Sequence, residues 1–169
     1  NKNTGVFTWL KRPPSMFSDS LKRTKEHNCN QWNARYIGTV AGNVHSKLGY
    51  ISISIFGEIY MAHRLAYLYM TGKWPKNDID HKNGNTSDNR WCNLRDATVA
   101  QNNANARLRK DNTCGFKGVS WHKANAMWRA RAMVEGKEIL IGYFHDLEDA
   151  VNAYRVWSKK KYEEYARFG

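Results

Sequence analysis

The chain of 169 residues lacks any apolar run that approaches the length of a membrane span, which takes about 20 residues. Cysteine is also scarce. Cys29, Cys92 and Cys114 are odd in number, widely separated and without a Cys-x-x-Cys pair. This spacing excludes a disulfide framework and a zinc site of the usual kind. No signal peptide is visible, so we expect reduced thiols, no zinc and a cytoplasmic protein.

Acidic residues are few relative to basic ones. The chain has 27 Lys+Arg and 15 Asp+Glu, which gives a net charge of +12 at pH 7. The excess is spread along the chain, with 8 basic and 3 acidic residues in 1–62, 9 and 5 in 63–112, and 10 and 7 in 113–169. A positive charge distributed in this way indicates a protein that lies along duplex DNA. Membrane surfaces and RNA also attract basic proteins, but no membrane partner is expected without an apolar span.

A polar segment at residues 80–85, Asp-His-Lys-Asn-Gly-Asn, holds groups that phosphodiester hydrolysis requires. The imidazole of His81 titrates near neutral pH, so it can take a proton from water. Asp80 provides an anionic oxygen and Asn102 a neutral carbonyl oxygen, which together suit Mg²⁺ or Mn²⁺. Asn93 can orient the imidazole by hydrogen bonding. These residue types predict a catalytic pair, His81 and Asn93, beside a metal-binding pair, Asp80 and Asn102.

The order of these residues resembles that of the HNH homing endonucleases of phage introns. Asp80 is followed after 13 positions (93 − 80) by Asn-Leu-Arg, and Asn93 after 9 positions (102 − 93) by Asn102. The sequence His-Arg-Leu-Ala at residues 63–66 is similar to the same family, and the likeness covers residues 35–110. The resemblance implies a compact strand, strand and helix around a metal, DNA as substrate, and the host cytoplasm as location if a phage encodes the protein.

Each of these residues also has a structural alternative. Asp80 could cap the turn that precedes the Gly/Asn-rich loop. Asn93 could shape the backbone before the helix, which is compatible with orienting His81. Asn102 is one of three neighbouring amides, of which two must lie on the helix surface. For His63 we favour a buried structural role over catalysis.

Hydrophobic patterning in the first 62 residues predicts a β-rich part. Residues 5–12 alternate as a strand does and are stopped by Pro13-Pro14. Residues 15–34 are polar and weakly patterned, which is typical of a loop. Residues 36–62 predict strands with turns at Gly42-Asn43 and at 56–58, because Ile51, Ile53 and Ile55 alternate with serines.

The patterning that follows predicts the elements of the nuclease core. Residues 63–70 have helical spacing, and Gly72 is positioned to end that helix. Residues 79–82 predict a short strand, and residues 83–90 a turn region. A second short strand and a helix capped by Thr98, running to about residue 108, complete the strand, strand and helix order.

The C-terminal third changes in composition after a charged segment at residues 107–113. Three alternating segments predict an antiparallel meander, and a helix with an apolar stripe follows from Asp146. This part resembles an APETALA2-type DNA-binding domain at Lys-Gly-Val (117–119), Trp-Arg-Ala-Arg (128–131), Gly-Tyr-Phe (142–144) and Glu-Asp-Ala-Val (148–151). The resemblance implies that the sheet lies in the major groove. On this resemblance, the residues expected to face DNA are Lys117, Ser120, His122, Arg129, Arg131 and Met133. From the charged segment, further contacts with DNA are expected from Arg107, Arg109 and Lys110.

Together the sequence predicts an α+β protein: a β-rich N-terminal part leading into a ββα-metal HNH core (1–106), a basic linker (107–113), and a three-stranded antiparallel sheet packed on one helix (114–169). The predicted activity is Mg²⁺- or Mn²⁺-dependent nicking of double-stranded DNA by a monomer, with a dimer as an alternative for cutting both strands. Two other readings stay open. One is a catalytically idle DNA-binding protein on an HNH scaffold, and the other is a nuclease acting on RNA.

Overall fold

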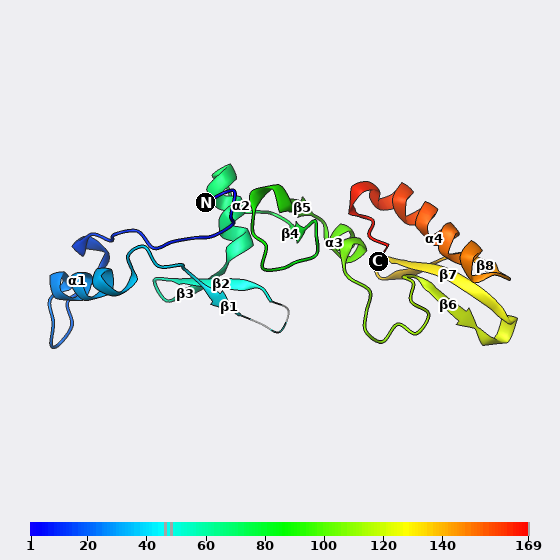
Figure 1. Ribbon diagram of the computed structural model, residues 1–169, viewed down its shortest axis with the longest axis horizontal. Coiled ribbons are helices and arrows are strands. Elements are labelled where there is room, and N and C mark those ends of the chain that lie inside the picture. The colour runs from blue at the N-terminus through cyan, green and yellow to red at the C-terminus, as the bar shows by residue number, and fades with distance from the viewer. Residues whose placement is uncertain (46, 48, 169) are drawn as a thin grey trace. The chain divides into compact units, whose positions relative to one another are not determined.

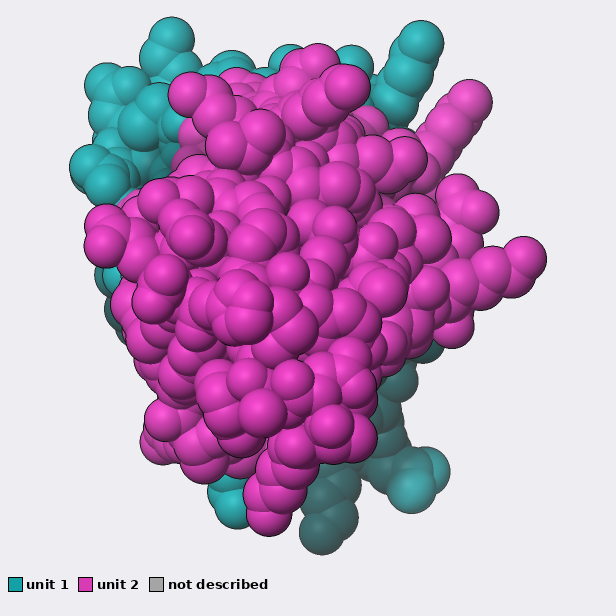
Figure 2. Space-filling view, turned by 90° about the vertical axis from the view of Figure 1, so that its right-hand side faces the viewer, with its two compact units in different colours: residues 1–74, 85–94 teal, residues 75–84, 95–169 magenta. Residues whose placement is uncertain are grey.

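The computed structural model describes residues 1–45, 47 and 49–168. By their contacts, the residues form two compact units: residues 1–74 with 85–94, and residues 75–84 with 95–169 (Figure 2). The described chain contains four α-helices and small β-sheets, so the predicted mixture of helix and strand is confirmed. This division does not follow the predicted boundary at residues 107–113, and the predicted domain ranges stay a prediction.

The first unit contains a sheet in the order β1 (Asn43–Val44), β2 (Ile51–Ile55) and β3 (Glu58–Met61). The turn at residues 56–58 is confirmed, since Phe56 and Gly57 have positive φ angles of 52° and 86° between paired strands. The turn predicted at Gly42-Asn43 is wrong, because Asn43 already belongs to β1. The link from β1 to β2 includes residues 46 and 48, which lie outside the described residues.

The helix predicted after these strands is present as α2 (Ala62–Thr71). It ends at Gly72, whose φ of 71° is the left-handed conformation that glycine adopts without strain. Ala62 packs with Ile53 of β2 and with Ala41 in a buried apolar cluster. The alternating isoleucines therefore mark the buried face of this sheet, as their spacing predicts.

Two predictions near the N-terminus are wrong. Residues 5–12 do not form a strand, because their pairing with residues 38–41 is reduced to a bridge between Thr8 and Val40. The expected loop at residues 15–34 contains most of α1 (Lys25–Tyr36). Thr24 caps this helix by accepting a hydrogen bond from the backbone N–H of His27.

The second unit begins with β4 (Asp78–His81), which forms a two-stranded sheet with β5 (Leu94–Ala97). Between them, a short 3-10 helix (Trp91–Asn93) follows the turn region. Helix α3 (Val99–Asn105) starts at Thr98, which forms a reciprocal capping box with Gln101. The helix ends at Asn105, before the predicted residue 108.

The rest of the second unit is a sheet of β6 (Val119–His122), β7 (Met127–Val134) and β8 (Lys137–Phe144), all antiparallel. Helix α4 (Leu147–Tyr162) packs on one face of it (Figure 1). The buried centre consists of Val119, Ala130, Ala150 and Val151. Ala130 of β7 and Ala150 of α4 are both completely buried in this cluster.

Candidate active site

Two carboxylates of β4 face helix α3. Asp78 and Asp80 are two positions apart, so they point to the same side of the strand. The Nδ2 of Asn102 donates to Asp78 Oδ2 at 3.4 Å, and the Nδ2 of Asn105 donates to Asp80 Oδ1 and Oδ2 at 2.8 and 3.0 Å. Positions i and i+3 of a helix lie on one face. Two hydrogen-bonded carboxylate–amide pairs therefore connect β4 to α3.

Asp80 is a buried charge with a buried partner. The Nε of Arg95 on β5 donates to Asp80 Oδ2 at 2.8 Å, and the side chains of Arg95 and Asp80 are 9% and 4% exposed. A carboxylate removed from water needs such compensation, because an unpaired buried charge is strongly unfavourable. The pair fixes the carboxylate between β5 and α3.

Asn105 is a site residue that the sequence patterning did not single out. It is 5% exposed, and its amide also donates to the backbone oxygen of His81 at 2.8 Å. One side chain thus holds both residues of the Asp-His pair. The signal that points to it is its position three residues after Asn102, on the same helix face.

His81 ends β4 and is buried, with 4% of its surface exposed. Alternation along the strand directs Ile79 and His81 away from the side that Asp78 and Asp80 occupy. Its backbone oxygen accepts from Gly84 N–H at 2.7 Å, which closes the turn after the strand. The backbone of His81 is thus held at the end of the strand by hydrogen bonds from Gly84 and Asn105.

Asn93 and His63 belong to the first unit. Asn93 is buried, and its Nδ2 donates to the backbone oxygen of Asp88 at 2.7 Å. This is the backbone-shaping alternative considered from the sequence, and it leaves the role toward His81 a prediction. His63 is buried on α2, with its ring 5.3 Å from that of Tyr50, as expected of a structural residue.

The donor set around β4 and α3 fits a hard cation. No group of three His, Cys, Asp or Glu side chains that could hold a metal occurs among the described residues. The oxygen donors of Asp80 and Asn102 are nonetheless of the kind that Mg²⁺ and Mn²⁺ prefer. A carboxylate has about four acceptor positions, and the hydrogen bonds to Asp80 do not fill them all.

Comparison with known proteins identifies an HNH endonuclease domain in this part of the chain. A family model described as HNH endonuclease matches residues 60–104, which contain Asp80, His81, Asn93 and Asn102. Protein 3.8 of Escherichia phage T7 is 37% identical over 90 residues, which are 53% of this chain and 74% of the phage protein. The chain belongs to the family of this phage protein and carries an HNH endonuclease domain. No solved structure matches it.

The HNH domain implies nuclease activity, a divalent metal and DNA as substrate. Asn105 lies one residue beyond the matched range. None of the helices in the described part of the chain is long and apolar enough to cross a membrane.

Beyond the HNH domain, the outer face of the β6–β8 sheet carries four of the residues expected to face DNA. Ser120 pairs with Arg129 and His122 with Met127, so these side chains lie opposite to Val119 and Ala130, which contact α4. Glu138 forms ion pairs with Arg129, at 3.7 Å, and with Arg131. The structure therefore brings Ser120, His122, Arg129 and Arg131 onto one face, with part of their charge compensated.

Lys117 is placed differently from these four. Its ammonium group donates to the backbone oxygen of Ala104 at the end of α3, at 3.0 Å. Burial lowers the pKa of Lys117 to about 8, with a smaller contribution from the charge of Arg167. Lys117 thus connects the sheet to the HNH helix, and its contact with DNA stays a prediction.

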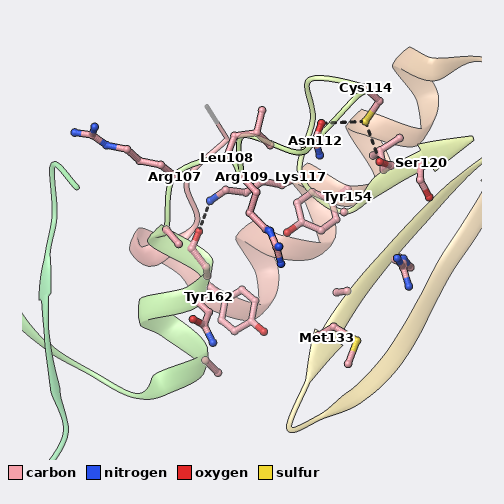
Figure 3. Close-up of a pocket in the computed structure, with 18 of the residues that line it drawn as sticks. Arg107, Leu108, Arg109, Asn112, Cys114, Lys117, Ser120, Met133, Tyr154 and Tyr162 are labelled. Atoms are coloured by element: carbon pink, nitrogen blue, oxygen red, sulfur yellow. Dashed lines mark hydrogen bonds between the residues drawn. The ribbon is translucent and has the colours of Figure 1, made fainter. Parts of the chain in front are cut away.

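The charged segment borders a cavity of about 980 Å³ between α3, the start of the sheet and α4 (Figure 3). Arg107, Arg109, Lys117, Ser120 and Arg131 are among the residues that line it, together with Tyr154 and Tyr162 of α4. Arg109 is also paired with Asp111 at 3.0 Å. Lys110 is exposed.

Proposed function

We propose that the protein is a metal-dependent endonuclease that hydrolyses phosphodiester bonds of duplex DNA and nicks one strand per monomer. The observation that carries this proposal is the fixed Asp80–His81 pair. Arg95, within the range of the HNH match, and Asn105, one residue beyond it, hold the buried carboxylate, and Asn105 also holds the backbone of His81. Catalytic groups need this kind of preorganisation, because small displacements reduce the rate strongly.

In the proposed reaction, His81 accepts a proton from the water that attacks phosphorus, and the bond from phosphorus to the 3′-oxygen breaks. Asn93 orients His81. Asp80 and Asn102 would hold Mg²⁺ or Mn²⁺, which as a Lewis acid supplies stabilisation of the negative charge that develops on the phosphate. The amide of Asn102 donates only to Asp78 among the side chains described, which leaves its oxygen available as a ligand atom.

The outer sheet face is proposed to position the DNA. Arg129 and Arg131 offer positive charge, while Ser120 offers a polar group beside them. Arg107, Arg109 and Lys110 would add phosphate contacts.

The test is conversion of supercoiled plasmid to the open-circle form with Mg²⁺ or Mn²⁺. We expect EDTA and the substitution His81→Ala to abolish conversion, because each removes an essential group. The variant should retain its affinity for DNA. His27→Ala, which replaces an exposed histidine of α1, serves as the matched control and should nick normally. Equal loss of cleavage and binding in His81→Ala would contradict the role of general base.

A second candidate function is metal-independent DNA binding on a catalytically idle HNH scaffold. It is favoured by the hydrogen bonds that occupy both oxygens of Asp80 within the protein. Tight DNA binding without any conversion of plasmid in Mg²⁺ or Mn²⁺ would support it over the nuclease.

A further inference from the structure

The chain segment after α4 returns to the HNH elements of the second unit (Figure 1). The hydroxyl of Tyr165 donates to the backbone oxygen of Asp96 on β5 at 2.8 Å. The backbone N–H of Arg167 donates to the backbone oxygen of Ala104 on α3 at 3.3 Å, and its Nη1 donates to that of Asn83, just after β4, at 3.0 Å. This C-terminal segment, residues 163–168, thus contacts β5, α3 and the turn that follows β4.

A glycine in the turn after β4 makes room for this segment. Gly84 has a φ of 66°, and a Cβ added there would collide with the guanidinium of Arg167. Gly84 is therefore suited to this position for two reasons: it adopts the left-handed conformation without strain, and it leaves room for the side chain of Arg167.

Arg95 connects this segment to Asp80. Its Nε donates to Asp80 Oδ2 at 2.8 Å, while its Nη1 donates to the backbone oxygen of Glu164 at 3.0 Å. The guanidinium carbon lies 3.8 Å from the centre of the Tyr165 ring. Because the guanidinium is planar and its donors are fixed relative to one another, groups that hold Nη1 and the plane also set the direction of Nε.

We propose that Tyr165 and the backbone carbonyl of Glu164 are positioning groups for the nuclease centre, acting on Asp80 through Arg95. This inference rests on the proposed role of Asp80 as a metal ligand. With Arg95 clamped, the Asp80 carboxylate has one fixed direction. Without the ring and the carbonyl, Arg95 can turn toward solvent and leave the carboxylate less well oriented.

The geometry ranks the contributions within the segment. The Tyr165 ring covers the guanidinium, so its removal should have the largest effect. The Tyr165 hydroxyl contacts β5 itself and should matter less. The Glu164 carboxylate is 67% exposed and 3.7 Å from Arg95, so its side chain should matter least, since the carbonyl makes the closer contact.

The test uses the full chain and the substitutions Tyr165→Ala, Tyr165→Phe and Glu164→Gln, with Tyr69→Ala as a control at an exposed tyrosine of α2. Binding of Mn²⁺ alone, measured by electron paramagnetic resonance, reports on the ligand set without any cleavage. We expect Tyr165→Ala to weaken Mn²⁺ binding by about 10-fold, which is the lower end for loss of groups that orient ligands. The Mn²⁺ affinity of Tyr165→Phe should lie between that of Tyr165→Ala and that of the wild type. Glu164→Gln and the control should bind Mn²⁺ as the wild type does.

A second readout observes Arg95 directly. The Nε–H signal of Arg95, assigned in NMR spectra by its absence in Arg95→Lys, should exchange slowly with solvent in the wild type and faster in Tyr165→Ala. In addition, the effect of Tyr165→Ala on Mn²⁺ binding should largely vanish in the Arg95→Lys background, because the two residues act in series. A merely structural tyrosine would lower the melting temperature without this coupling.

The outcomes separate the inference from the proposed function. A wild type that neither binds Mn²⁺ nor nicks plasmid overturns the metal-dependent nuclease. A wild type that does both, with unchanged Mn²⁺ binding and Arg95 exchange in a folded Tyr165→Ala, overturns the positioning role alone. If Tyr165→Ala does not fold, Tyr165→Leu retains apolar volume without the ring face and is judged by the same two measurements.

Discussion

The two halves of the second unit are stabilised by different chemistry. In the β6–β8 sheet and α4, the centre is apolar and consists of small and β-branched side chains, with Ala130 and Ala150 completely buried. Around β4, β5 and α3, the buried residues include Asp80, His81 and Asn105. An apolar centre is non-directional and supplies stability, whereas a buried polar network must be satisfied in full and specifies one geometry. The molecule thus separates the part that holds the fold from the part that orients reactive groups.

The largest expected effect is a charge placed in the apolar half. Ala150→Asp should lower the free energy of unfolding by about 3–5 kcal/mol, because the carboxylate would be buried without a partner. Val156→Asp on the same helix is the matched control, since Val156 is 71% exposed. Urea denaturation followed by circular dichroism measures both. A loss below about 1 kcal/mol for Ala150→Asp would show that α4 is not packed as described.

An intermediate effect is expected in the polar half from Asn105→Ala. The substitution removes the donor to Asp80 and to the His81 carbonyl, which should cost about 1–3 kcal/mol of stability and reduce nicking about 10-fold or more. Asn103→Ala, at an exposed position of α3, should change neither. Unfolding curves and single-turnover nicking are the measurements. If the Asn103 and Asn105 variants behave alike, the amide does not organise the site.

The smallest effect is expected at the outer sheet face. Arg129→Gln and Arg131→Gln should each make the salt dependence of DNA affinity less steep by about one phosphate contact. The effect on affinity should be modest, because Glu138 already compensates part of this charge. Arg155→Gln, exposed on α4, is the control. Equal slopes of log affinity against log salt in all variants would exclude this face as the DNA contact.

The same contrast explains what could be predicted from the sequence. The alternating segments of β6–β8 and the apolar spacing of α4 are visible because an apolar centre leaves a periodic pattern. The order of β4, β5 and α3 was predictable from motif spacing and from the cap at Thr98. These signals are local, so they survive without knowledge of the tertiary structure.

Features that depend on polar or distant contacts were not predictable. Helix α1 buries Asn33, whose side chain accepts from Arg12 N–H and donates to the Arg12 carbonyl, so its inner face does not look apolar. Residues 5–12 alternate like a strand but pair too little to form one. The role of Asn105 depends on which face of α3 packs on β4. The role of Tyr165 depends on contacts with β5, such as that with Asp96, which is 69 positions away in the sequence.

The route of the C-terminal segment has a consequence for the order of folding. The contacts of Asp80 with Arg95 and with Asn105 join residues 15 and 25 positions apart, whereas those of Glu164 and Arg167 with Arg95 and Asn83 join residues 69 and 84 positions apart. Closing a loop of 69 instead of 15 residues costs roughly 1.3 kcal/mol more in chain entropy. The local carboxylate contacts therefore form early, and the clamp on Arg95 closes late. By the same ordering, this segment should be the first part of the second unit to open, so its amide protons should exchange before those of β4 and α3.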